Sequence, residues 1–114
     1  MYRKLLIATL VCIGFSLNAQ FIEEVLEYTP APGQLINDPV WGTPAAANSI
    51  TGTTTGHVSL GAFGGYVVFR FANPVENHPD NPYGIDFTIF GNPLSDWAEP
   101  ACVRIMNDDN ANGE

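Results

Sequence analysis

The residues best able to do chemistry lie in the run NDDNANGE, where oxygen-bearing side chains recur at alternate positions. From Asp108 onward, the run matches the first half of a calcium-binding loop, D-x-[DN]-x-[DN]-G. The side chains of Asp108, Asn110 and Asn112 can converge on one hard cation. Gly113 supplies the sharp turn, and Glu114 can offer its backbone carbonyl. The run therefore predicts a Ca²⁺ site, although the same residue types also form ordinary turns.

A second candidate site surrounds Trp97, which is flanked by Asp96 and Glu99. This arrangement is compatible with sugar binding, because an indole ring can stack on a sugar while carboxylates accept hydrogen bonds from its hydroxyls. A solvated loop explains the three residues equally well, and we prefer that interpretation. Trp41 is a further aromatic residue in a polar stretch, where it either plugs the end of the core or faces a ligand.

The two histidines do not form a recognisable catalytic group with any acid. His57 is interpreted as a surface residue beside a glycine-rich turn, and His78 as a loop residue in NHPDNP. The glycines of GAFGG are not a phosphate-binding loop, because no Lys-Ser/Thr pair follows them and they lead into a strand. We expect Gly61, Gly64 and Gly65 to occupy a tight turn with positive φ.

Four segments are expected to form strands and to position these residues. In YVVFRF, residues 66–71, apolar positions 67, 69 and 71 alternate with the others, and IDFTIF, residues 85–90, repeats the pattern. A third strand is expected at 101–106, and a shorter one at 21–28. Prolines in the loop between 71 and 85 cannot continue a ladder.

The pattern predicts an all-β protein, an antiparallel β-sandwich of jelly-roll-like architecture. Residues 35–37 could add a brief edge strand, and Ala45–Ser49 could form one helical turn. Because the last strand has no partner in the sequence and the calcium loop lacks its closing carboxylate, we expect residues 20–114 to be the N-terminal part of a longer β-sandwich domain.

The amino terminus has the layout of a secretory signal peptide. Arg3 and Lys4 precede an apolar run too short to span a membrane, and the small residue Ala19 precedes Gln20. Residues 1–19 are therefore excluded from the fold, and the mature chain should be secreted or lie at the cell surface. We expect no lipid on Cys12, because the bulky Val11 precedes it.

The mature chain is strongly acidic. After residue 19 the chain has two arginines, no lysine and all 12 acidic residues, which gives a formal charge of −10. Nucleic acid and anionic membranes are poor partners for such a surface, and no transmembrane segment is expected in the mature chain. Cys102 is its single cysteine, and we expect it to be buried as a small apolar residue.

The order of several motifs resembles a family. SLGAFGG, PYGIDFTIFGN and DDNANG resemble the motifs SLGGFGG, PYGxDFxxFGN and DxNxNG of secreted cell-surface β-sandwich proteins of Bacteroidota, and EYTPAPGQLIN is similar to their opening. Ala62 and the pair Pro93-Leu94 depart from the pattern. The resemblance covers nearly all of the mature chain and implies a β-sandwich on an exported protein, often with further repeats downstream.

Three functions are compatible with these observations. The first is a non-catalytic, exported binding or adhesion module with a calcium-stabilised loop, whose partner is an extracellular glycan or a surface protein. The second is an accessory domain or part of an extracellular hydrolase acting on glycans, suggested by Trp97 between Asp96 and Glu99. The third is a structural spacer domain, which would bind no ligand.

Overall fold

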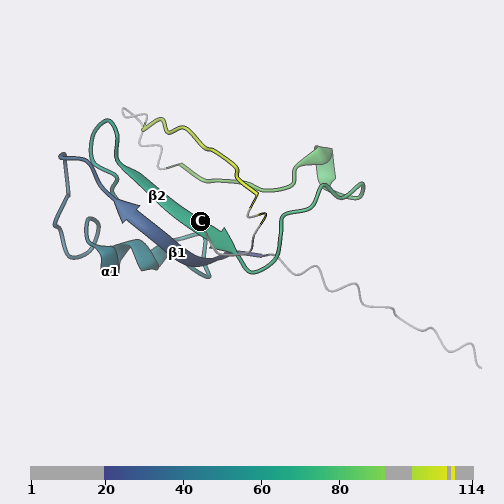
Figure 1. Ribbon diagram of the computed structural model, residues 1–114, viewed down its shortest axis with the longest axis horizontal. Helices are drawn as coiled ribbons and strands as arrows, with labels where there is room; N and C mark the ends of the chain where they lie inside the picture. Colours follow the sequence, from purple (N-terminus) through teal and green to yellow (C-terminus); the bar gives the residue numbers. More distant parts are fainter. Residues whose placement is uncertain (1–19, 92–98, 108, 110–114) are drawn as a thin grey trace, which may run out of the picture.

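Two antiparallel strands form the centre of the protein (Figure 1). The computed structural model describes residues 20–91, 99–107 and 109. The elements follow in the order β1 (Ile22–Thr29), α1 (Pro44–Ala47), η1 (Asn48–Ile50), β2 (Tyr66–Phe71) and η2 (Pro82–Gly84). Within these residues, no helix has the length and apolarity that crossing a bilayer requires.

The strand predicted at 66–71 is confirmed, and so is the short strand predicted at 21–28, which becomes β1. The register pairs Ile22 with Phe71 and Thr29 with Tyr66, and it shifts twice along the ladder. Phe69 and Phe71 are half-buried, and their rings meet edge to face at 6.0 Å between centroids. Of the alternate positions, Tyr66 and Arg70 are exposed as the period of two predicted, whereas Val68 is half-buried.

The helical turn predicted near Ala45 is also confirmed. Thr43 caps α1, because its hydroxyl accepts a hydrogen bond from the backbone N–H of Ala46 at 3.1 Å. Pro44 stands at the first helical position, where its missing N–H costs nothing. The only residues with buried apolar side chains in the described part of the chain, Ala46 and Ala47, lie on this turn, which packs near β1.

The predicted β-sandwich is wrong for the part of the chain that the structure describes. Its sheet has two strands, and the expected strands at 85–90 and 101–106 form no ladder. In 85–90, the one backbone–backbone hydrogen bond is that of Ile85, whose N–H reaches back to Pro82. Periodicity predicts which side chains a strand would bury, but a strand forms only where a second segment pairs with its backbone. Neither segment has such a partner among residues 20–91 and 99–107.

Two smaller expectations are also corrected. Residues 35–37 form a turn and not an edge strand, with positive φ at Leu35 (63°) and Asn37 (66°). Cys102 is exposed and not buried, because the strand expected to carry it is absent. The positive φ predicted for the glycine turn before β2 is confirmed at Gly61 (75°) and Gly64 (94°), but the prediction is wrong for Gly65, whose φ is not positive.

Candidate functional site

Gln20 and Asn73 hold together the end of the sheet at which β1 begins and β2 finishes. The Gln20 side-chain amide donates to the Asn73 carbonyl at 2.7 Å. Its Oε1 accepts from the Asn73 backbone N–H at 3.1 Å and from Nδ2 at 3.0 Å. Three hydrogen bonds between residues 53 positions apart fix where the chain leaves β2. They therefore position the loop that follows.

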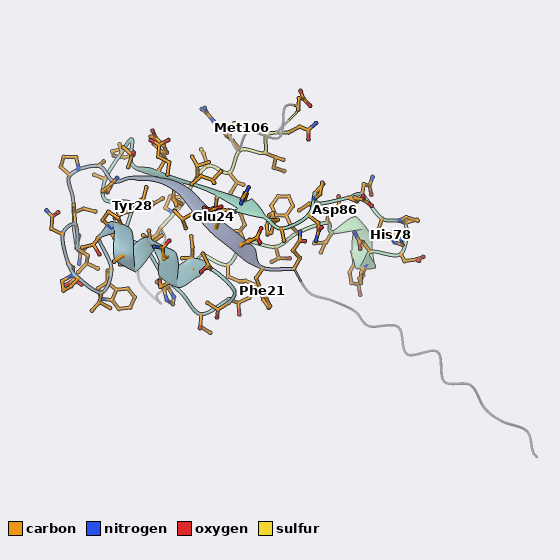
Figure 2. The ribbon with its side chains drawn as sticks, turned by 60° about the horizontal axis from the view of Figure 1, so that its bottom comes forward. Phe21, Glu24, Tyr28, His78, Asp86 and Met106 are labelled. Carbon is orange, nitrogen blue, oxygen red and sulfur yellow. The ribbon has the colours of Figure 1, made fainter. Side chains whose placement is uncertain are left out.

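A groove of about 410 Å³ opens at this end of the sheet, between β2 and the segment that follows η2. Its volume is within the range of small-molecule sites. Its lining combines aromatic and aliphatic surface with amide, hydroxyl and carboxylate groups: Gln20, Phe71, Pro74, Val75, Glu76, Asn81, Asp86, Phe87 and Thr88. Figure 2 shows Asp86 beyond the end of the strands, on the side of the molecule that also carries His78.

The polar wall of the groove is partly ordered by its own hydrogen bonds. Asn81 Nδ2 donates to Asp86 Oδ1 at 2.9 Å, which leaves Asp86 Oδ2 and the side-chain Oδ1 of Asn81 as acceptors. Glu76 adds a second carboxylate to the lining, which includes no Lys, Arg or His among the residues that the structure describes. The groove can therefore accept several hydrogen bonds from a neutral ligand, and it repels anions.

The exposed face of the sheet carries a different polar cluster. Tyr66 Oη donates to Glu27 Oε1 at 2.6 Å, and Thr29 Oγ1 donates to the same oxygen at 2.9 Å. These bonds, with the one from Tyr66 the stronger, lower the pKa of the Glu27 carboxyl from its ordinary value. Beside it, Arg70 and Glu24 form an exposed cross-strand ion pair at 2.7 Å. The cluster therefore adds side-chain contacts between the paired strands β1 and β2.

The Tyr28 side chain contacts the loop that precedes β2. Its hydroxyl donates to the Ser59 carbonyl at 2.6 Å. Burial raises the pKa of this phenol, because the charged form would lose solvation. Tyr28 therefore remains a hydrogen-bond donor that ties the loop before β2 to β1.

Trp41 neither plugs a core nor lies free in solvent. Its ring is 39% exposed and meets the exposed His57 edge to face at 5.8 Å. Asp38 Oδ1 accepts from the backbone N–H groups of Val40 and Trp41, and the Trp41 carbonyl accepts from Ser59. The prediction that His57 lies on the surface is confirmed.

Most of the predicted site residues lie outside the described residues: Asp96, Trp97, Asp108, Asn110, Asn112 and Glu114. Glu99 is described and exposed. Asp109 accepts a hydrogen bond from Asn107 Nδ2 at 2.6 Å. Among the described residues, no three His, Cys, Asp or Glu side chains gather as metal ligands would. The calcium loop and the Trp97 contact therefore stay predictions.

The groove was missed from the sequence because its walls come from distant positions. The sequence marked residues 73–84 as a loop rich in turn formers, which is where function often lies. Nothing in the spacing, however, indicates that Gln20, Phe71 and Phe87 would line the same groove.

No protein-family model, curated protein or solved structure matches this chain.

Proposed function

We propose that the mature chain is an exported binding or adhesion module, and that the groove beside Asn81, Asp86 and Phe87 holds its ligand. The observation that carries the proposal is the lining of the groove, which includes two aromatic side chains together with several hydrogen-bond acceptors. Protein sites that recognise small molecules combine apolar surface with a few convergent polar groups in this way.

The ligand class that fits this lining best is a neutral glycan. Sugar hydroxyls can donate to the carboxylates of Asp86 and Glu76, and the C–H face of the ring can rest on Phe71 or Phe87. The net charge of −10 for residues 20–114 and the absence of a basic group from the lining disfavour phosphorylated or sulfated ligands.

The proposal also includes export through a cleaved signal peptide and binding of Ca²⁺. The basic, apolar and small-residue order of residues 1–19 supports cleavage after Ala19, so the secreted chain should begin at Gln20. Intact mass measurement of the secreted protein tests this start. In the downstream loop, Asp108 is the candidate charged ligand for Ca²⁺, with a stabilising rather than a chemical role.

A glycan array followed by calorimetry of the best neutral glycan tests the site. We expect Asp86→Asn and Phe87→Ala to weaken binding about tenfold or more, because each removes a charge-assisted hydrogen bond or a stacking surface. The matched controls are Asp80→Asn and Phe90→Ala, which change the same residue types outside the groove lining. These controls should bind as the parent does.

Two results would contradict the proposal. Equal affinity of Asp86→Asn, Phe87→Ala and the parent would place any glycan elsewhere. Turnover of a glycan in a hydrolase screen, lost in Asp86→Asn, would make the groove an active site and not a binding site.

A further inference from the structure

Gln20 connects the end of the sheet to the groove. Its side-chain amide makes the three hydrogen bonds to Asn73, which we call the terminal clasp. Figure 1 shows the start of the described chain beside the end of β2, as these bonds require. The Gln20 side chain also lines the groove, together with the residues that follow Asn73: Pro74, Val75 and Glu76. The clasp therefore positions part of the groove lining through a single side-chain amide.

Gln20 is also the residue that the proposed signal cleavage leaves at the amino terminus. Cleavage after Ala19 converts the backbone amide of Gln20 into a free α-amine. Gln20 is exposed, so that solvent and enzymes can reach it in the folded chain. One residue thus combines a free α-amine, a side-chain amide and a structural role at the groove.

A glutamine with a free α-amine can close a lactam on its own side chain. The α-amine nitrogen attacks Cδ, a C–N bond forms, and the bond between Cδ and Nε2 breaks. Nε2 leaves as ammonia and takes a proton from the attacking amine, so the step needs no oxidant, reductant or second substrate. The lactam retains Oε1 as its carbonyl oxygen and is neutral, so the charge of the amino terminus is lost.

Lactam closure and the terminal clasp use the same atoms. Nε2 donates to the Asn73 carbonyl at 2.7 Å, and this bond is lost with the ammonia. Oε1 accepts from the Asn73 backbone N–H and from Nδ2, and closure ties this oxygen to a ring that contains the main-chain nitrogen of Gln20. The ring lacks the side-chain rotations by which a free glutamine reaches its partners. The lactam therefore cannot keep all three bonds to Asn73.

We propose that Gln20 is a modification site, and that closure of its lactam opens the terminal clasp and weakens ligand binding in the groove. This role rests on the proposed cleavage after Ala19 and on the proposed binding of a ligand in the groove. When the clasp opens, the Gln20 amide leaves the lining, and residues 74–76 lose the bonds that hold the preceding Asn73 in place. The chain with an intact Gln20 is the tighter binder, and the lactam form is the weaker one.

Treatment of the secreted chain with a glutaminyl cyclase tests the proposal. Intact mass measurement first verifies that the chain starts at Gln20, and then follows closure as the loss of one ammonia. Amide hydrogen exchange is measured by NMR before and after closure. The Asn73 backbone N–H should exchange about fivefold faster or more after closure, because it loses its acceptor Oε1. The Ala31 N–H, which donates to the Leu60 carbonyl, should exchange at an unchanged rate.

Calorimetry with the neutral glycan that the untreated chain binds measures the effect on the groove. Closure should lower the affinity about fivefold or more, since hydrogen bonds that position the lining are lost. The matched control is Gln20→Asn, whose side chain is one methylene too short to close the ring. Cyclase treatment should change neither the mass of this variant nor its exchange rates nor its affinity. Asn73→Ala removes only the bond from Nδ2, so the backbone amide at position 73 should exchange faster than in the parent and more slowly than after closure.

Three outcomes would overturn the role of Gln20 alone: resistance of the folded chain to the cyclase, an unchanged exchange rate of the Asn73 amide after closure, or an unchanged glycan affinity. A secreted chain that starts at another residue would overturn the proposed cleavage as well. If the untreated chain binds no neutral glycan, the proposed function of the groove fails, and the exchange rate of the Asn73 amide still decides whether closure opens the clasp.

Discussion

Residues 20–71 and residues 72–107 are both rich in β-branched and aromatic residues, yet among the described residues only the first region forms a ladder. In the first region, β1 and β2 pair along their length, and the loop between them is tied down by hydrogen bonds such as Gly52 to Ile22 and Ala31 to Leu60. In the second, the apolar side chains of 85–90 and 101–106 are largely exposed. We infer from this difference that a pairing partner, and not the alternation of apolar and polar residues, decides whether a segment becomes a strand.

The two regions therefore have different roles in this account. The first holds the fold through the sheet, α1 and close backbone contacts. The second supplies most of the lining of the groove that a ligand would occupy. Substitutions of the same kind in the two regions should separate stability from binding.

The largest expected effect is at Gly42, a buried glycine of the first region. A Cβ atom at this position would lie 1.8 Å from the Leu35 carbonyl oxygen, so Gly42→Val must displace backbone. We expect a loss of about 2–4 kcal/mol in the free energy of unfolding, measured by urea titration. Gly91→Val is the matched control in the second region, because nothing lies within 4 Å of a Cβ atom there. Similar losses in both variants would contradict the claim that the first region contributes more to stability than the second.

A smaller difference is expected between two phenylalanines. Phe71 is half-buried at the end of β2 and packs against Phe69, whereas Phe90 is 71% exposed. Phe71→Ala should lower the free energy of unfolding by about 1–2 kcal/mol, less than a fully buried phenylalanine would cost. Phe90→Ala should change it by less than about 0.5 kcal/mol, as surface substitutions usually do. Thermal and urea unfolding of both variants provide the test, and a greater loss from Phe90→Ala would contradict it.

Calcium should have an effect of similar or smaller size. At about ten times its dissociation constant, Ca²⁺ bound through Asp108 would stabilise the chain by about 1.4 kcal/mol. Asp108→Ala should abolish the calcium-dependent rise in Tm, whereas Asp109→Ala should retain most of it, since the Asp109 carboxylate already accepts a bond from Asn107. Calorimetry with and without chelator measures the rise. No calcium dependence, or a greater sensitivity at Asp109, would mean that the run is a turn.

The smallest effect concerns pH and the exposed face of the sheet. Hydrogen bonds lower the pKa of Glu27 below its ordinary 4.5. Their contribution to the free energy of unfolding is therefore fully present above pH 4.5. It is lost as pH falls through the lowered value of the folded state. Tyr66→Phe removes the larger of the two causes, so the Glu27 pKa should rise toward 4.5 and the acid-dependent loss should shrink. Carboxyl NMR titration follows Glu27 directly, and an unshifted titration in Tyr66→Phe would exclude the bond.

Much of the first region could be predicted from the sequence. The period of two gave the bounds of β2, and the apolar positions of FIEEVLEY indicated β1. Local chemistry likewise predicted the helical turn at Ala45 and the positive φ of Gly61 and Gly64. These features depend on neighbours in the chain, where residue type is a reliable guide.

The sandwich and the groove could not be predicted, because both depend on which distant segments meet. Ile85–Phe90 has the same alternation as β2, and its backbone still finds no ladder in the described residues. Gln20 reaches the groove only through its bonds with Asn73. Asp96 and Trp97 stood out by type alone, and residue type does not determine the geometry of a site.

Amide hydrogen exchange of the secreted chain tests the contrast between the two regions most directly. We predict slow exchange for the paired amides of β1 and β2, and fast exchange for the amides of 85–90 and 101–106. Protection of 85–90 and 101–106 in the free chain equal to that of β2 would contradict the account, because both segments would then already be paired.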